Sequence, residues 1–267
     1  MLNFCSLYSG SSGNSLFVET ENTKILIDAG MSCKKIEEGL QSIEVDPSSI
    51  NAILVTHEHA DHVKGLGTLS KKFDIPVFST QKTFDAMPVQ TEKISEKNIK
   101  YFNPSEKFCI NDLEILPFNI PHDAANPCGF NIIKDNSHQL SIATDVGHMT
   151  KSIVDNLEGS EFILLESNYD TEVLRCCAYP YSLKSRIASD TGHLSNTMAG
   201  KTISYLLKNG KLSTAMLGHL SKESNFPELA YQTVVDEIIS HVSLNSCRQS
   251  NERLIDMDSL QYTNSCL

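Results

Sequence analysis

Short apolar runs rich in β-branched residues recur along the chain, separated by turns of Gly, Asn, Asp and Pro. Such runs predict strands, whereas apolar residues spaced three and four positions apart predict helices. In the first half the expected strands are "FCSLYS", "SLFVET", "KILIDAG", "INAILV" and "IPVFST", and the expected helices are "SCKKIEEGL", "DHVKGLGTLSKKF" and "QKTFDAM". A meander of strands therefore opens the fold, and strands and helices alternate after it.

The second half begins with further strands and ends in helices. The expected strands are "KFCI", "LEILPFNI", "CGFNIIKD", "QLSIATD", "EFILLES" and "TAMLGHLS", and the expected helices are "SNTMAGKTISYLLKNG" and "PELAYQTVVDEIIS". Strands followed by helices, occurring twice, predict two sheets packed face to face with helices outside. We expect a single domain over residues 1–240 and a polar extension over 241–267 that holds at most one further strand.

The composition is typical of a globular protein with an acidic surface. With 267 residues, of which 40% are hydrophobic, the chain can bury a large core. A net charge of −11 disfavours binding to nucleic acid through overall attraction, so any contact with a polyanion must be local.

Targeting features and cysteines point to one compartment. No apolar run approaches the roughly 20 residues of a membrane span, and the N-terminal "MLNFCSLYSG" lacks the features of a signal peptide. We therefore expect a cytoplasmic protein with no membrane partner. The eight cysteines form no C-x-x-C pair, which in a reducing compartment predicts free thiols.

The stretch "THEHADH" at 56–62 directly follows an expected strand and carries three of the nine histidines. Histidine and aspartate side chains are ligands for zinc, manganese or iron, and the chain places more of them after other apolar strands. The candidate ligands are His57, His59, Asp61, His62, His122, Asp145 and His219. Any one of them alone would suit a structural role, but seven at strand ends predict a site for two divalent metal ions.

The pattern H-x-H-x-D-H after a strand, followed by separate His, Asp and His at strand ends, resembles the metallo-β-lactamase superfamily. That resemblance implies an α/β fold, a four-layer αββα sandwich with two metals at the sheet edge. Within the superfamily, "SGSSGNS", "ESNYD", "YPYSLKSRIASDTGHLSN" and "HLSKESNFPELA" resemble a stand-alone bacterial nuclease branch often encoded beside a cell-wall sensor-kinase operon. The resemblance covers nearly the whole chain except the tail.

The resemblance also implies a role for each candidate ligand. His57, His59 and His122 would hold one ion, Asp61, His62 and His219 would hold the second, and Asp145 would bridge both. Asp28 would support the histidine loop from behind, the alternative being a simple turn residue at a strand end. The branch commonly reads "ESNHD", so Tyr169 stands where a histidine is usual and the identity of the general acid stays open.

The reaction expected of such a site is hydrolysis. Two divalent ions together activate water and stabilise an in-line displacement at phosphorus, although the same chemistry opens thioesters and lactones. We expect Asp61, Asp145 and His193 to be catalytic. His193, in "SDTGHLSN", would protonate a leaving oxygen or bind phosphate, the alternative being a packing role at a helix start. Substrate contacts are expected from Lys184, Arg186, His193 and Lys222.

The function that the resemblance favours is cleavage of phosphodiester bonds by a DNA exonuclease. One alternative is a small-molecule phosphodiesterase or a thioester or lactone hydrolase of the same fold. Another, from a different class, is a metal-bearing regulatory or binding protein without turnover, which Tyr169 would suit. The sequence leaves the metal, the strand polarity and the oligomeric state open.

Overall fold

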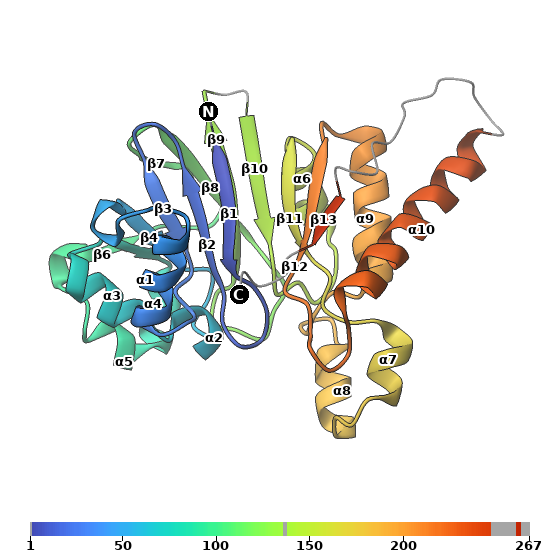
Figure 1. The fold of residues 1–267 in the computed structure, drawn as a ribbon, viewed down its shortest axis with the longest axis horizontal. Helices are drawn as coiled ribbons and strands as arrows, with labels where there is room; N and C mark the ends of the chain where they lie inside the picture. The colour runs from blue at the N-terminus through green and yellow to red at the C-terminus, as the bar shows by residue number, and fades with distance from the viewer. Residues whose placement is uncertain (1, 136–137, 247–259, 263–267) are drawn as a thin grey trace. The chain divides into compact units, whose positions relative to one another are not determined.

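The structure of the chain, a computed structural model, describes residues 2–135, 138–246 and 260–262. They form two compact units: unit 1 lies within Met1–Asn119 and Asp123–His138, and unit 2 within Ile120–His122 and Gln139–Asn264. Figure 1 labels most of the helices and strands of both units. None of the helices in the described ranges combines the length and the apolar character that crossing a membrane requires.

Unit 1 is built around a six-stranded sheet whose strands follow chain order. The first three strands pair antiparallel, and from β3 onward each strand pairs parallel with the next. The strands are β1 (Asn3–Tyr8), β2 (Ser15–Glu19), β3 (Lys24–Ile27), β4 (Ala52–Leu54), β5 (Val77–Ser79) and β6 (Ile99–Tyr101). Because β3 and β4 run parallel, their carboxyl ends lie at the same edge of the sheet.

Helices and a three-stranded meander complete unit 1. The helices are α1 (Cys33–Ser42), η1 (Pro47–Ser49), α2 (Ala60–Val63), α3 (Leu66–Phe73), α4 (Gln81–Ala86), α5 (Pro88–Thr91) and η2 (Glu96–Asn98). The antiparallel meander is β7 (Phe108–Ile110), β8 (Leu113–Asn119) and β9 (Cys128–Lys134). Strand residues Leu26, Ile53 and Val77 are fully buried and belong to one apolar cluster with Ile36 and Leu40 of α1. Burial of such side chains is the main favourable term in folding.

Unit 2 contains four parallel strands and five helices among its described residues. The strands are β10 (His138–Ala143), β11 (Phe162–Glu166), β12 (Thr214–Gly218) and β13 (Leu260–Tyr262), and the helices are α6 (Lys151–Leu157), α7 (Thr171–Cys176), α8 (Tyr181–Ile187), α9 (Asn196–Asn209) and α10 (Pro227–Ser246). These four strands pair in the order β10-β11-β12-β13.

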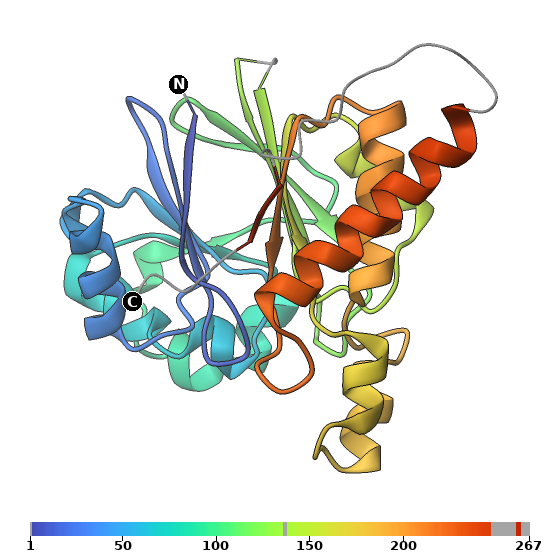
Figure 2. The same cartoon turned by 45° about the vertical axis from the view of Figure 1, so that its right-hand side comes forward.

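The helices α9 and α10 lie side by side (Figure 2). Gly200 makes their close approach possible, since a Cβ atom there would lie 2.7 Å from Cβ of Glu237. Ser195 caps α9 by accepting a hydrogen bond from Met198 N.

The expected strands and the longer helices are confirmed, with two differences in the bounds of the expected helices; β6 and the helices α5 to α8 were not among the expected elements. "DHVKGLGTLSKKF" folds as two helices, α2 and α3, because the chain bends at Gly65, whose N–H donates to Ala29 O at 2.8 Å. Helix α10 continues to Ser246, past the expected end at 240, since "HVSLNS" carries no helix breaker. The boundary between domain and extension at 240/241 stays a prediction. Most of 241–267 lies outside the described residues, apart from the end of α10 and β13.

Candidate metal site

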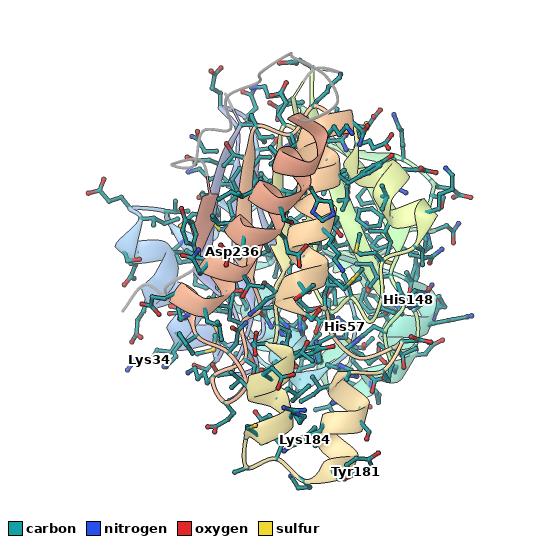
Figure 3. The ribbon with its side chains drawn as sticks, turned by 90° about the vertical axis from the view of Figure 1, so that its right-hand side faces the viewer. Lys34, His57, His148, Tyr181, Lys184 and Asp236 are labelled. Carbon is teal, nitrogen blue, oxygen red and sulfur yellow. The ribbon has the colours of Figure 1, made fainter. Side chains whose placement is uncertain are left out.

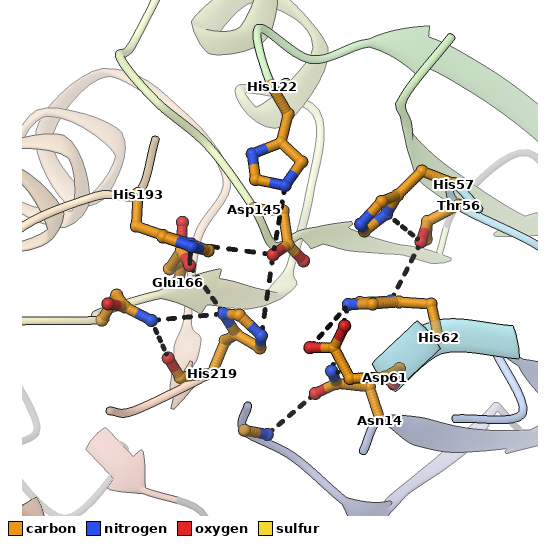
Figure 4. Close-up of polar contacts among 12 residues, drawn as sticks. Asn14, Thr56, His57, Asp61, His62, His122, Asp145, Glu166, His193 and His219 are labelled. Atoms are coloured by element: carbon orange, nitrogen blue, oxygen red, sulfur yellow. Dashed lines mark hydrogen bonds and ion pairs between the residues drawn. The ribbon is translucent and has the colours of Figure 1, made fainter. Parts of the chain in front are cut away.

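In unit 1 the loop after β4 and the short helix α2 bring three histidines together. The ring centroids of His57 and His59 lie 4.6 Å apart, and those of His57 and His62 lie 4.1 Å apart. His57 and His62 are buried, while His59 and Asp61 are partly exposed. Asp61 Oδ2 lies 3.8 Å from His62 Nε2. The four predicted ligands of this loop therefore form one cluster, of which Figure 4 labels His57, Asp61 and His62.

Asp28, at the end of β3, fixes the orientation of this cluster. Its carboxylate accepts hydrogen bonds from Thr56 N and Thr56 Oγ1, both at 2.8 Å, and lies 2.7 Å from His62 Nδ1. A carboxylate only accepts, so Nδ1 carries the proton and Nε2 presents its lone pair. Thr56 Oγ1 in turn lies 3.0 Å from His57 Nδ1, which orients that ring in the same way. Asp28 thus lies behind the histidine loop, and its role as a support for metal ligands stays a prediction.

The turn "GSSGN" anchors the histidine loop, a role that sequence reasoning missed. Asn14 N donates to Asp61 O at 2.8 Å, and Asn14 Nδ2 lies 3.1 Å from His62 Nε2. Gly30 N donates to Asn14 O at 2.8 Å, so Gly30, Asn14 and Asp61 are locked together. The sequence offered only a Ser- and Asn-rich turn, which is usual in hairpins.

Gly30→Ala should disrupt this anchor. A Cβ atom at position 30 would lie 1.7 Å from Asp61 O, so the loop must move away. We expect a loss of about 1–3 kcal/mol in the free energy of unfolding, typical of overpacking, together with weaker metal binding. Denaturant unfolding and metal analysis would measure both. Gly39→Ala is the control, because the nearest atom there is the partly exposed ring of Tyr8 at 3.0 Å; an equal loss in both variants would contradict the argument.

In unit 2 three histidines converge on one buried carboxylate. His122 Nε2 lies 3.7 Å from Asp145 Oδ1, and His219 Nε2 and His193 Nδ1 each lie 3.6 Å from the same oxygen (Figure 4). Asp145 follows β10 and His219 follows β12, and both have left-handed backbones with φ of 58° and 55°. Non-glycine residues rarely adopt this conformation, and those that do cluster at functional sites.

Glu166, at the end of β11, organises this second cluster. Its Oε1 lies 2.8 Å from both His193 Nδ1 and His219 Nδ1, and its Oε2 accepts from Val146 N and Leu194 N at 2.7 and 3.1 Å. Burial by itself would raise the pKa of Glu166, but His193 and His219 outweigh it and hold that pKa below its usual value. An ionised Glu166 keeps the protons of both imidazoles on Nδ1. Glu166 was not among the site residues expected from the sequence.

His122 is held by the backbone. Its Nδ1 lies 2.9 Å from Gly192 O, a carbonyl that can only accept, so Nε2 faces Asp145 unprotonated. Burial lowers the pKa of His122, against the opposing effect of Asp145. The neutral imidazole is the form that binds a metal.

A buried amide network lies behind His219. Asn168 Nδ2 donates to His219 O at 2.8 Å, and Asn225 Nδ2 donates to Ser167 O and Asn168 O at 2.8 and 3.1 Å. Asn196 and Asn225 also bond to each other through their side chains. Three Ser-Asn pairs, at 167–168, 195–196 and 224–225, thus join the ends of three segments. Each Ser-Asn pair alone is typical of a helix cap or a turn, so the sequence could not predict that the three pairs lie together.

The predicted basic contacts lie on other segments of unit 2. Lys184 and Arg186 are on α8, where Lys184 Nζ donates to Arg175 O at 2.7 Å. Lys222 is exposed in the turn between β12 and α10. Their contacts with a substrate stay predictions. Tyr169 is partly buried, and burial, with a smaller effect of Glu166, raises the pKa of its phenol, so the hydroxyl stays protonated at neutral pH.

The donors of both units fit a divalent metal. Within each unit, buried imidazoles have Nδ1 held by an acceptor, which is the usual arrangement of histidines that bind metal through Nε2. The donor atoms are nitrogen and carboxylate oxygen, a set that zinc, manganese and iron all accept.

Comparison with known proteins agrees with this chemistry. Residues 23–219 match the family model described as a beta-lactamase superfamily domain. The chain is 37% identical over 233 residues to exodeoxyribonuclease YycJ of Bacillus anthracis, covering 87% of this chain and 88% of that protein. It is 38% identical over 234 residues to exodeoxyribonuclease WalJ of Streptococcus pneumoniae serotype 2, covering 87% and 86%.

A solved structure shows the same fold. The metallo-beta-lactamase fold protein YhfI from Bacillus subtilis matches with a TM-score of 0.68 at 16% identity, over 99% of this chain and 98% of that one. The α/β fold expected from the histidine motif is thereby confirmed. By its sequence and its fold, this chain belongs to the metallo-β-lactamase superfamily, in the same family as the two bacterial exodeoxyribonucleases.

Proposed function

We propose that this protein is a two-metal-dependent hydrolase that cleaves phosphodiester bonds, and that it acts as an exonuclease on DNA. The observation that carries the hydrolase proposal is the convergence of His122, His193 and His219 on the buried carboxylate of Asp145. DNA as the substrate is supported by identity over most of the chain to two proteins named exodeoxyribonucleases.

The proposed ligands are the seven that the sequence singled out. His57, His59 and His122 would hold one ion, Asp61, His62 and His219 would hold the other, and Asp145 would serve both. Zinc, manganese and iron are the candidate metals. When bound, such a pair of ions supplies a nucleophilic water at neutral pH and neutralises charge that develops on the phosphate.

His193 is proposed to donate a proton to the leaving oxygen or to bind a phosphate oxygen. Its side chain is 13% exposed, so a substrate can reach it, and Glu166 Oε1 lies 2.8 Å from its Nδ1, which orients the ring. Tyr169, with its raised pKa, can donate a hydrogen bond nearby but is a weaker acid than an imidazolium.

Substrate contacts are proposed to be local, because the chain as a whole is acidic. Lys184, Arg186 and Lys222 would pair with phosphates along the strand. We also propose a cytoplasmic location, since DNA is the proposed substrate and the six described cysteines are free thiols, as is usual in a reducing compartment.

The test is digestion of a linear duplex that carries a label at its 5′ or its 3′ end. We expect one label to be released early as a mononucleotide, which also gives the direction of digestion. Release of neither label, with cleavage of a small phosphodiester or a thioester by the same preparation, would instead favour a small-molecule hydrolase. If the protein binds metal but cleaves neither the duplex nor the small phosphodiester nor the thioester, a binding protein without turnover would be favoured.

A further inference from the structure

Helices α7 and α8 of unit 2, together with Tyr169, line an open surface pocket of about 400 Å³. The two helices lie together at one end of unit 2 in Figures 1 and 2. The pocket is lined by Tyr169, Thr171, Leu174, Arg175, Tyr181, Lys184, Ser185 and Ala188. Its volume falls within the range of pockets that bind small ligands, roughly 300–1,000 Å³, and it is too small for a base pair in a duplex.

The side chains of this pocket combine aromatic rings with cations. Tyr181 is a large aromatic side chain that is 85% exposed, so its ring is accessible to a ligand. Lys184 donates one of its three ammonium hydrogens to Arg175 O, which leaves two for a ligand. Figure 3 shows Tyr181 and Lys184 on the same helix, α8. Aromatic faces and cations together are the means by which proteins hold single-stranded nucleic acid.

The local charge also favours an anion. Residues 171–187 carry three basic side chains and one acidic side chain, whereas the whole chain has a net charge of −11. The one acidic side chain, Glu172, is paired with Arg175 on the surface of α7. Residues 171–187 thus form a positively charged segment of an acidic protein. This segment attracts a phosphate, whereas the net negative charge of the chain repels one.

The pocket adjoins the cluster around Glu166. Tyr169, which lines the pocket, lies three residues after Glu166, and its carbonyl oxygen accepts from Asn196 N at 2.9 Å. Asn168 N donates to Leu194 O at 2.8 Å, so the pocket wall is hydrogen-bonded to the segment that carries His193. The pocket is therefore connected through the backbone to the segment that carries His193.

We propose that the α7–α8 pocket binds one unpaired nucleotide of the DNA strand, with its base stacked on Tyr181 and its phosphate paired with Lys184. This inference rests on the proposed function. It adds that the protein grips the substrate through a single-stranded end, one nucleotide at a time.

The experiment measures binding without relying on cleavage. The full-length chain, stripped of metal, is titrated into a short single-stranded oligonucleotide with one 2-aminopurine near its end. Fluorescence anisotropy gives Kd, and quenching of the 2-aminopurine reports stacking on an aromatic ring. The variants are Tyr181→Ala, Tyr181→Phe and Lys184→Met. The controls are Tyr205→Ala and Lys208→Met, an exposed tyrosine and an exposed lysine on α9 that do not line the pocket.

We expect the unmodified chain to quench the probe, Tyr181→Ala to raise Kd about tenfold and to abolish quenching, and Tyr181→Phe to preserve both. Lys184→Met should raise Kd and reduce the slope of log Kd against log salt by about 0.7. The controls should bind as the unmodified chain does. Since Tyr181 is exposed, its replacement should leave the thermal unfolding midpoint unchanged.

The inference is overturned if the unmodified chain binds no single strand, or if the pocket variants bind as tightly as the controls. Failure of the proposed function would look different, because binding and stacking at the pocket would persist while neither end label was released. If the chain cleaves DNA and the pocket variants bind the single strand as tightly as the controls do, only the proposal for the pocket would be wrong.

Discussion

Asp145→Asn is expected to abolish cleavage of DNA, with kcat/KM falling by about 10³-fold or more. Three imidazoles approach Asp145 Oδ1 at 3.6–3.7 Å, and the carboxylate is buried. Its negative charge therefore lies at the centre of this group of imidazoles. A loss of several kcal/mol of transition-state stabilisation corresponds to that factor, because each 1.36 kcal/mol is tenfold. Asparagine is preferred to alanine here, since φ is 58° and asparagine tolerates the left-handed region.

Metal analysis should show that the same variant binds fewer ions per chain. Asp155→Asn is the matched control, an exposed aspartate on α6 that pairs with Lys151 on the surface and whose contribution to stability is small. We expect it to keep both activity and metal. If Asp145→Asn retained a tenth or more of the activity, the proposed role of this carboxylate would be wrong.

Glu166→Gln should lower metal affinity or kcat about 10- to 100-fold, the usual cost of losing a residue that orients metal ligands. Glu166 accepts from two imidazoles and two backbone N–H groups, whereas a glutamine has a single acceptor oxygen. Its NH2 group would face donors, which leaves at least one buried N–H without a partner. We therefore also expect a loss of about 1–3 kcal/mol in the free energy of unfolding.

The control for this substitution is Glu228→Gln, at an exposed position in the first turn of α10. It should change neither metal affinity nor activity. We expect it to change the free energy of unfolding by about 0.5 kcal/mol at most. The account of Glu166 would not survive if its variant bound metal and turned over substrate as Glu228→Gln does.

Much of the site was predictable because it is local in the sequence. His57, His59, Asp61 and His62 come from a single loop after a recognisable strand, and Asp28 follows another strand. The same rule, that polar residues after buried strands meet at a sheet edge, singled out His122, Asp145 and His219, whose roles as metal ligands stay predictions. Strand periodicity is short and clear in such apolar runs, which is why the sheets were predicted well.

The supporting residues were not predictable, because their partners are distant in the chain. Glu166 joins donors at positions 146, 193, 194 and 219, and no spacing in the sequence links these positions. Asn14 bonds across 47 residues to Asp61. Helices α7 and α8 have six and seven residues, too short for a helical repeat to be visible, so the pocket they form was missed as well.

The most direct test of the central claim is a metal titration of the stripped protein with the end-labelled duplex as substrate. Zinc or manganese is added in increments, and bound ions and released nucleotide are measured in the same samples. We predict no cleavage without metal, a maximum at two ions per chain, and no recovery for Asp145→Asn at any metal concentration. Full cleavage by the metal-free chain, or two bound ions with no release of nucleotide, would contradict the claim that this is a two-metal exonuclease.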